Sequence, residues 1–509
     1  MNISGMLARN ARRHPDKEAL IYEEKRYSYR QLNESVNCLA NALAGLGVRK
    51  GDKVALMMQN SDRYVIAFMA ALRLGAVVVP INFRLAVPEV EYIVNHSDSG
   101  TLIYDPEYVN IVNSLRAKLF GVCNMICAGS GEGAAGTLQW NALVDGVSPE
   151  EPGVMVEGWD DCEILYTSGT TGRPKGALFD HHRVIHVGIV MVVHMGVNPR
   201  DRLLHVAPLF HSAQLNLFLV SGMYVGATHV VMRAFEPRAV LDTIQRERVT
   251  LFFGVPTMYN FMLQVPNFSD YDIGSVTRFG YGAAPMPMEL VRQALAKFPT
   301  DRIYNLCGLT EGGPGGVLLE PEDQLRKPGA GGKAIINSEA RVVDDVGSDV
   351  TPGRVGEFII QGETIMKEYY KNPEATAETL KDGWLYTGDL ATIDDEGYIT
   401  LVDRKKDMII TGGENVYSTE VEHALYQHPG VLEAAVIGVR HPVWGETVTA
   451  MVCSKAGIIV TGEELKAFCA GYLADYKIPR IYKFIKALPR NASGKVLKRV
   501  LRDGYREDN

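Results

Sequence analysis

YTSGTTGRPKG, residues 166–176, combines four small hydroxyl side chains, three glycines and one lysine directly after an apolar pair, Ile164–Leu165. Glycines let backbone amides approach phosphate oxygens closely, while hydroxyls and an ammonium group add donors and charge. The spacing differs from that of the P-loop, GxxxxGK[ST], so a P-loop kinase is not indicated. A flexible surface loop is the alternative, which so dense a pattern disfavours. We therefore predict a phosphate-binding loop with contacts from Thr167, Ser168, Gly169, Thr170, Thr171, Gly172 and Lys175.

Apolar strands and helices alternate on the N-terminal side of this loop. Residues 19–22, 53–58 and 76–81 have the composition of strands, and residues 28–46 and 63–74 have the pattern of helices. Repeated strand–helix units and near-continuous apolar runs such as AVVVPI indicate parallel sheets covered on both faces. Beyond the loop, residues 203–232 carry no charge but contain Pro208, His211 and Asn216. This composition favours a buried part of an α/β core over a membrane helix.

Changes in composition divide the chain. A Gly-rich stretch (129–136) precedes a Pro- and acid-rich run, residues 340–402 are β-rich, and the charged DRKKD (403–407) precedes an α+β pattern. Thr419 with Glu422, and Thr461 with Glu464, have the spacing of helix capping boxes. We predict an α/β fold with a large N-terminal domain (1–403), a hinge (404–407) and a small mobile α+β C-terminal domain (408–509). The N-terminal domain would contain two sheet-and-helix subdomains (about 1–160 and 161–330) and a small β-rich subdomain (331–403).

Composition excludes some classes of protein and favours one compartment. A net charge of −8 and a pI near 5.9 argue against nucleic-acid binding. The seven cysteines are scattered and odd in number, which suits a reducing cytoplasm rather than a disulfide framework. The N-terminus has no apolar signal-peptide region, and no transmembrane segment is expected. Loose contact with a membrane surface stays open, and nothing in the sequence indicates an oligomeric state.

Three further motifs carry polar groups suited to a nucleotide. NLCGLTE (305–311) places the hydroxyl of Thr310 beside the carboxylate of Glu311, a combination that can contact phosphate and hold Mg²⁺. WLYTGD (384–389) places Asp389 after a glycine turn, where a carboxylate can accept hydrogen bonds from ribose hydroxyls. YGAAP (281–285) is a small-residue turn. Taken singly, the last two motifs are more often plain turns.

In this order along the chain, the motifs resemble those of the adenylate-forming superfamily, which includes acyl-CoA synthetases, luciferases and the adenylation domains of peptide synthetases. The resemblance covers essentially the whole chain and is greatest to bacterial fatty-acyl-CoA synthetases. It implies an AMP-forming acid:CoA ligase in fatty-acid and lipid metabolism. Mg²⁺ would be its cofactor, and ATP and CoA its co-substrates. The resemblance assigns ATP and AMP contacts to the loop and to Gly282, Ala283, Ala284, Asn305, Cys307, Gly308, Thr310, Asp389 and Arg404, with Glu311 as the metal ligand.

Cys307 departs from the family pattern, which often has an aromatic residue stacked on adenine at this position. The resemblance also makes Lys406 the hinge residue. Gly412 and Gly413, in IITGGENV (409–416), would line the CoA channel, the alternative being a plain β-turn. Lys495, in PRNASGK (489–495), would reach the acid carboxylate and the α-phosphate, the alternative being a solvated lysine. The catalytic set implied is therefore Lys175, Thr310, Glu311 and Lys495.

The acid is the least specified part of the prediction. The resemblance places the acyl pocket among His211, Gln214, Asn216, Gly254, Gly312 and Gly313, although a histidine such as His211 is often only a core residue. Glycines after Glu311 leave room for a long acyl group, so we expect a medium- or long-chain fatty acid. An aryl acid of the cinnamate or benzoate type is the alternative, followed by a luciferase-like oxygenase and a non-catalytic lipid- or nucleotide-binding protein. No carrier domain follows Lys495 before Asn509, which favours free CoA as acceptor.

Overall fold

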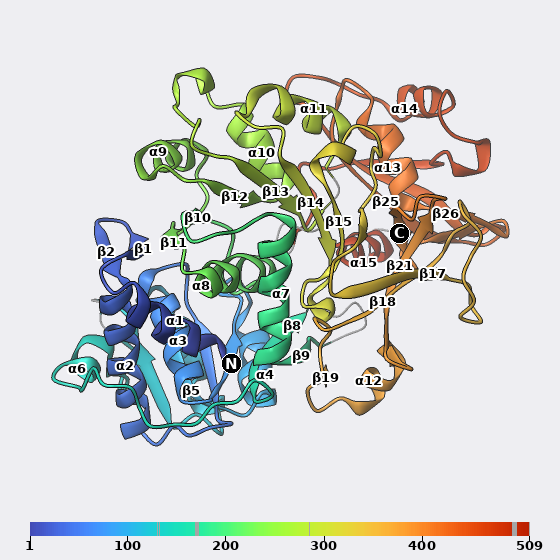
Figure 1. The fold of residues 1–509 in the computed structure, drawn as a ribbon. Helices are drawn as coiled ribbons and strands as arrows, with labels where there is room; N and C mark the ends of the chain where they lie inside the picture. Colours follow the sequence, from blue (N-terminus) through green and yellow to red (C-terminus); the bar gives the residue numbers. More distant parts are fainter. Residues whose placement is uncertain (130, 132, 168–172, 285, 491–495, 508–509) are drawn as a thin grey trace. The chain divides into compact units, whose positions relative to one another are not determined.

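The computed structural model describes residues 1–509 except 130, 132, 168–172, 285, 491–495 and 508–509. Figure 1 shows the ribbon, coloured along the chain. The chain divides into two compact units: Met1–Ala340 with Ile360–Leu385, and Arg341–Ile359 with Tyr386–Asn509. These units reflect packing density, so the functional subdomain and hinge boundaries given above remain predictions.

One eight-stranded sheet of the first unit carries the ends of the phosphate loop. Its order is β19-β9-β8-β4-β3-β5-β6-β7. The six strands from β8 to β7 in this order run parallel to one another. β9 pairs antiparallel with β8, with which it forms a hairpin, and with β19. The strands are β3 (Lys53–Met57), β4 (Val77–Pro80), β5 (Ser99–Tyr104), β6 (Asn124–Cys127), β7 (Leu138–Gln139), β8 (Asp161–Thr167), β9 (Lys175–Asp180) and β19 (Glu368–Tyr369).

The N-terminal helices begin where the sequence supplies side-chain caps. Ser28 and Gln31 form a capping box at α2, and the Ser61 hydroxyl accepts a hydrogen bond from the Tyr64 amide at α3. Almost every residue of α3 is buried, as its apolar sequence predicts. The helices are α1 (Ile3–Arg13), α2 (Tyr29–Gly45), α3 (Asp62–Arg73), α4 (Val87–His96), α5 (Val109–Leu115) and α6 (Trp140–Val144).

A nine-stranded sheet forms the other layer of this unit, in the order β16-β15-β14-β13-β12-β10-β11-β1-β2. Its strands are β1 (Glu18–Tyr22), β2 (Lys25–Ser28), β10 (Arg202–His205), β11 (Thr228–Val231), β12 (Leu251–Gly254), β13 (Arg278–Gly282), β14 (Ile303–Gly308), β15 (Gly316–Leu319) and β16 (Lys333–Ala334). The accompanying helices are α7 (His181–His194), α8 (Ser221–Val225), α9 (Pro237–Glu247), α10 (Pro256–Leu263) and α11 (Met288–Lys297).

The uncharged stretch 203–232 folds as β10, a π-helix (Ala213–Val220), α8 and β11, so its assignment to the α/β core is confirmed. Within the described part of the chain, no helix is both long enough and apolar enough to cross a membrane.

The remaining elements form two five-stranded sheets with helices. One sheet contains β17 (Ser338–Val343), β18 (Gly356–Gly362), β20 (Leu380–Lys381), β21 (Trp384–Ile393) and β22 (Ile399–Arg404), and α12 (Pro373–Thr379) lies in the same part of the chain. The other contains β23 (Ile409–Thr411), β24 (Glu414–Val416), β25 (Val431–His441), β26 (Gly445–Ser454) and β27 (Ile481–Phe484), with α13 (Ser418–Tyr426), α14 (Gly462–Cys469) and α15 (Lys498–Glu507). The predicted mixed α/β class is confirmed.

One of the two predicted C-terminal capping boxes is wrong. Thr461 and Glu464 cap α14 as expected. At α13 the N-cap is Tyr417, which makes no side-chain cap. The Thr419 hydroxyl donates to the Val402 carbonyl instead, and Glu422 accepts from the Val436 amide. Tertiary hydrogen bonds have taken the groups that a local cap would have used.

Candidate active site

The strands beside the phosphate loop place two of its predicted contacts. β8 ends at Thr167 and β9 begins at Lys175, and the two residues are paired in the antiparallel register. Both side chains are half-buried. The predicted contacts Ser168, Gly169, Thr170, Thr171 and Gly172 lie outside the described residues, as does Lys495.

The carboxylate of Glu311 is fixed at the end of this hairpin. Its Oε1 accepts hydrogen bonds from the Thr167 hydroxyl at 3.2 Å and from the Tyr369 hydroxyl at 2.8 Å. Its backbone carbonyl accepts from the Met366 amide at 2.8 Å. Thr310 and Glu311 begin a short 3₁₀ helix and are both half-buried. A positioned, partly accessible carboxylate beside hydroxyl groups is the oxygen-donor chemistry that Mg²⁺ prefers, so these residues fit the predicted ion.

Tyr369 contacts both charged residues of the site, although no motif in the sequence points to it. The Lys175 ammonium lies 4.8 Å from the centroid of the Tyr369 ring, while the hydroxyl of the same residue holds Glu311. Tyr369 reaches this place because β19 pairs with β9, opposite Ala177. Aromatic residues in short strands are usually core residues, so only the pairing of β19 with β9 reveals this one.

Three neighbouring strands end in glycine on one edge of the nine-stranded sheet. β12, β13 and β14 run parallel and end at Gly254, Gly282 and Gly308. A Cβ atom on Gly282 would lie 2.4 Å from the Leu306 carbonyl oxygen, and one on Gly308 would lie 2.1 Å from that of Pro314. Ligands bind at the carboxyl ends of strands in open α/β sheets. This edge is therefore a suitable platform for the predicted adenine contacts.

The other predicted adenine contacts follow these strand ends. Ala283 and Ala284 are exposed, and Ala283 has a φ of 64°, which turns the backbone sharply after β13. The Asn305 amide donates to the Ala330 carbonyl at 3.1 Å, so its side chain braces a neighbouring loop. Cys307 is half-buried on β14. These positions as adenine contacts remain predictions.

Two predicted acyl-pocket residues lie inside the core. Gln214 is fully buried, and its amide lies 2.7 Å from Nδ1 of His205. Asn216 is fully buried and donates to Glu163 Oε1 at 2.6 Å. Burial raises the pKa of Glu163 to about 7. Both amides thus stabilise internal polar groups, and their contact with an acyl chain remains a prediction.

The remaining acyl-pocket positions differ in accessibility. His211 is half-buried, and its Nδ1 accepts from the Ala213 amide at 3.3 Å. Gly254, Gly312 and Gly313 are buried. A Cβ on Gly313, whose φ is 83°, would lie 2.2 Å from the Thr364 carbonyl oxygen. Glycine there permits close packing against the segment after β18, which also holds Glu311.

The second unit carries the predicted ribose contacts. Asp389 on β21 and Arg404 on β22 are paired across the strands, and Arg404 Nε lies 3.0 Å from Asp389 Oδ1. Both side chains are partly accessible, so the pair can present a carboxylate and a guanidinium to a sugar. Lys406 is exposed in the turn that follows.

Gly412 and Gly413 form the two-residue turn of the β23–β24 hairpin. Their φ angles are 60° and 87°, the left-handed values that glycine adopts without strain. Both are exposed, and nothing lies within 4 Å of a Cβ built on Gly413. The local structure is thus a β-turn, and the predicted role of these glycines in CoA binding remains a prediction.

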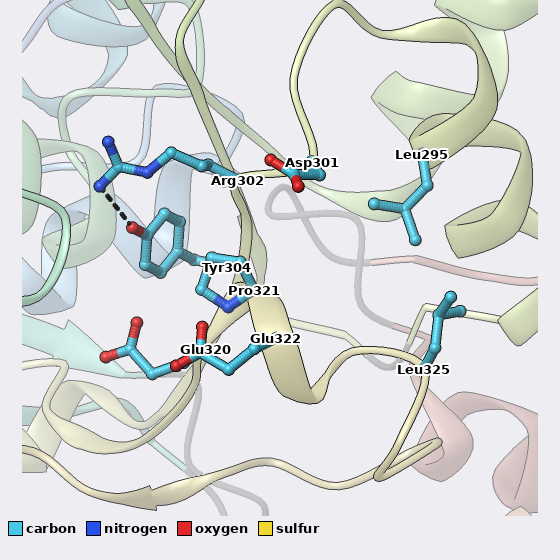
Figure 2. Close-up of a pocket in the computed structure, with 8 residues that line it drawn as sticks. All are labelled: Leu295, Asp301, Arg302, Tyr304, Glu320, Pro321, Glu322 and Leu325. Carbon is cyan, nitrogen blue, oxygen red and sulfur yellow. Dashed lines mark hydrogen bonds between the residues drawn. The ribbon is translucent and has the colours of Figure 1, made fainter.

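A separate cavity of about 480 Å³ lies near the beginning of β14 (Figure 2). Arg302, Tyr304 and Glu320 are among its lining residues, and Arg302 donates to the Tyr304 hydroxyl at 3.0 Å. Since the site described above lies at the opposite end of this strand, the cavity is not part of it.

Comparisons with known proteins identify the family of the chain. The family model described as AMP-binding enzyme matches residues 7–370, and the model described as AMP-binding enzyme C-terminal domain matches residues 420–495. A feruloyl-CoA synthase of Amycolatopsis is 38% identical over 494 residues, which cover 97% of each chain. The long-chain-fatty-acid–CoA ligase FadD13 of Mycobacterium tuberculosis is 39% identical over 506 residues, covering 99% of this chain and 98% of the relative. The crystal structure of the anthranilate CoA ligase AuaEII in complex with anthranoyl-AMP has a TM-score of 0.93 at 31% identity and covers 100% of this chain and 98% of its own.

Proposed function

This chain belongs to the AMP-binding enzyme family, and from that premise we propose that it joins a medium- or long-chain fatty acid to CoA. It is an AMP-forming acyl-CoA synthetase: ATP and the acid give an acyl-adenylate and pyrophosphate, and CoA then takes the acyl group and releases AMP. The observation that carries the site assignment is the group formed by Lys175, Tyr369, Glu311 and Thr167 at the β8–β9 hairpin.

In the first half-reaction, the acid carboxylate attacks the α-phosphorus of ATP and pyrophosphate leaves. Both reactants are anions, so the site must screen charge and align the atoms. Lys175 supplies positive charge beside the phosphates, Thr310 donates a hydroxyl to them, and Lys495 contacts the α-phosphate and the acid. Glu311, held by Thr167 and Tyr369, would hold Mg²⁺, which neutralises phosphate charge when bound. No general base is needed because the acid is already ionised at neutral pH.

In the second half-reaction, the CoA thiol attacks the acyl carbon and AMP leaves. Asp389 and Arg404 bind the ribose, which keeps the adenylate in place between the two steps. Lys406 acts as the hinge about which the C-terminal domain turns, and the Gly412–Gly413 turn lines the path of the pantetheine arm. The absence of Cβ atoms at this exposed turn supports the last role, because a narrow thiol arm can pass close to the backbone.

The choice of acid rests on the relatives, because the glycine run after Glu311 does not open the space for an acyl chain that its sequence suggests. Cβ atoms on Gly312, Gly313, Gly315 and Gly316 would lie 2.9 Å or less from other protein atoms, so these glycines permit close packing of the protein itself. FadD13 is named for long-chain fatty acids, which supports a medium- or long-chain fatty acid as the substrate. A feruloyl-CoA synthase of almost equal identity supports an aryl acid as the second candidate.

We place the enzyme in the cytoplasm, acting on small molecules. None of its seven cysteines, all of which the structure describes, is in a disulfide. The acidic net charge of −8 disfavours nucleic acid as a partner. Because fatty acids partition into membranes, the enzyme could take its substrate from a membrane surface.

The test is AMP release by purified protein with ATP and Mg²⁺ across a panel of acids, with and without CoA. We expect turnover with CoA to be fastest for straight-chain acids of medium or long length. Faster turnover with ferulate or benzoates would replace the fatty acid by the aryl acid. Failure of every acid would contradict the proposed function.

A further inference from the structure

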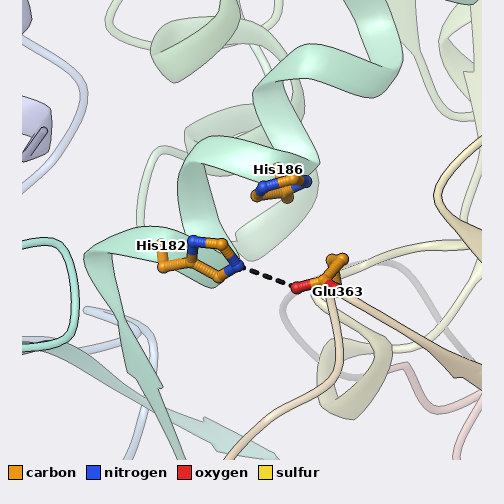
Figure 3. A group of neighbouring side chains, drawn as sticks. All are labelled: His182, His186 and Glu363. Atoms are coloured by element: carbon orange, nitrogen blue, oxygen red, sulfur yellow. Dashed lines mark hydrogen bonds and ion pairs between the residues drawn. The ribbon is translucent and has the colours of Figure 1, made fainter.

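A second group of ligand-type side chains lies on the first unit, apart from the site of Glu311. His182 and His186 lie one turn apart on α7, and Glu363 follows β18 (Figure 3). One ligand atom of each residue can be chosen so that all three lie within 4.8 Å of one another. Residues four apart on a helix share a face, so both imidazoles point toward the segment that carries Glu363.

The two imidazoles and the backbone at Glu363 are positioned before any ligand arrives. His182 Nε2 lies 2.8 Å from Glu363 Oε2, and the two imidazole rings lie 4.4 Å apart. The Trp159 ring stacks on His182 at 4.1 Å. Asn337 joins the two segments, because its side-chain amide donates to the His186 backbone carbonyl at 3.1 Å and its backbone carbonyl accepts from the Glu363 backbone amide at 3.2 Å.

The group is also accessible to solvent, and Glu363 gives it a negative charge that would attract a cation. The side chains of His182 and Glu363 are 26% and 56% exposed. Arg183, a cation next to the group, forms an ion pair with Asp180, and its Nε donates a hydrogen bond to the Ile365 carbonyl. Glu363 can therefore turn toward an incoming ion without breaking a buried contact.

We propose that His182, His186 and Glu363 bind one divalent first-row transition-metal ion, of which Zn²⁺ is the probe of choice. Two imidazole nitrogens and one carboxylate oxygen form a common zinc ligand set, with the fourth position left to water. Bonds of about 2.0–2.2 Å require the ligand atoms to approach to roughly 3.3 Å. The flexible Glu363 side chain can supply most of that movement. Asn337 Nδ2 lies 3.3 Å from His186 Nδ1. If His186 bound the ion through Nε2, its Nδ1 would carry the proton and could not accept from the Asn337 amide, so this weak contact would have to break.

An ion at this position would fasten α7 to the segment that positions Glu311. Glu363 is followed by Thr364, whose carbonyl packs against Gly313, and by Met366, whose amide donates to the Glu311 carbonyl. We therefore expect the ion to stabilise this part of the first unit without entering the reaction. The proposal is independent of the function proposed above.

The test uses full-length protein stripped of metal and titrated with Zn²⁺ against a competing chelator dye. We expect one ion per chain, with a thermal midpoint that rises with Zn²⁺ concentration, as mass action requires. His182→Ala, His186→Ala and Glu363→Gln should each weaken binding by more than about tenfold. Absence of saturable binding, or unchanged affinity in all three variants, would overturn the proposal.

His194→Gln is the matched control. His194 lies on the same helix and contacts a carboxylate, Glu320, at 2.7 Å, but the pair lies outside the three-residue group. The control should bind like the unaltered protein. Co²⁺ substitution should give visible d–d bands without thiolate charge-transfer bands, and circular dichroism verifies that each variant is folded. Thiolate bands would show that the ion binds cysteine and would also overturn the proposal.

Discussion

The position of the Glu311 side chain depends on Tyr369, a residue outside every sequence motif described above. Its hydroxyl donates to Glu311 at 2.8 Å, and its ring faces the ammonium of Lys175. The Thr167 hydroxyl contributes a second, longer hydrogen bond of 3.2 Å to the same oxygen. We infer that Tyr369 is a positioning residue for the metal-binding carboxylate.

Tyr369→Phe removes the hydroxyl and keeps the ring beneath Lys175. Because a hydrogen bond to a charged group contributes about 1.5–3 kcal/mol, we expect acid-dependent pyrophosphate exchange to fall about tenfold or more. The Mg²⁺ concentration for half-maximal rate should rise as well, which a purely structural role would not cause. Tyr370→Phe is the control, since it removes a hydroxyl that donates to Asp98 instead, at 2.9 Å. Equal losses in both variants would contradict this role.

Glu311→Gln keeps the shape of the side chain and removes its charge. We expect adenylate formation, measured by the same exchange, to fall by about a hundredfold or more, because the site loses its anionic metal ligand. The exposed Glu322, on the 3₁₀ helix after β15, provides the control Glu322→Gln. Retained exchange in Glu311→Gln would remove this residue from the metal site.

The sequence alone indicated Lys175 and Glu311, because each stands in a local motif whose chemistry can be read without the fold, whereas Asp389 was selected through the resemblance to the adenylate-forming superfamily. The sequence could not supply Tyr369, which meets Glu311 only through the β19–β9 pairing. Gln214 and Asn216 show the reverse problem. A polar side chain in an apolar stretch can line a pocket or satisfy a buried partner, and here the partners are His205 and Glu163.

At the scale of elements, we expect a change in the β23–β24 hairpin to affect the second half-reaction and not the first. Gly413→Leu should slow thioester formation from supplied acyl-adenylate by about tenfold or more, because a side chain would block close approach of the thiol arm. Pyrophosphate exchange should be unchanged.

Gly457→Leu is a matched control for backbone strain, since Gly457 has a φ of 76° against 87° for Gly413 and equally open surroundings. Both substitutions place a side chain at positive φ in an exposed turn of the same unit. Equal loss of thioester formation in both variants would assign the effect to strain rather than to CoA.

Element boundaries were predicted best where the cap is local. Ser28 and Thr461 begin helices as their sequences indicate. Thr419 and Glu422 have the same spacing, but a β-strand carbonyl and a strand amide compete for them. That competition depends on the position of Val402 and Val436, which no local pattern contains.

At the scale of the whole molecule, a buried carboxyl makes stability depend on pH. Burial raises the pKa of Glu163 to about 7, from an ordinary value near 4.5. The folded chain therefore keeps a proton that the unfolded chain releases between these values. The stabilising contribution is complete below the lower value and is lost as pH rises through the higher one.

Glu163→Gln keeps an acceptor for Asn216 and abolishes the titration. We expect its free energy of unfolding, relative to the unaltered protein, to increase between pH 5 and pH 8, by on the order of 3 kcal/mol at most. Denaturant unfolding at both pH values measures this difference, and the exposed Glu157→Gln should show none. A difference that stays constant with pH would contradict the burial of an ionisable Glu163.

The mixed α/β class followed from the alternation of strands and helices, because that pattern is a property of each segment. The division into packing units did not follow. Both units contain separated segments, Ile360–Leu385 in one and Arg341–Ile359 in the other, and a segment's partners across the chain leave no local signature.

The most direct measurement is the exchange of labelled pyrophosphate into ATP with Mg²⁺ and a fatty acid, in the absence of CoA. The account predicts exchange that requires the acid, and loss of that exchange in Lys175→Ala. Exchange that is absent with every acid, or that persists in Lys175→Ala, would contradict the claim that the β8–β9 hairpin and Glu311 form the adenylating site.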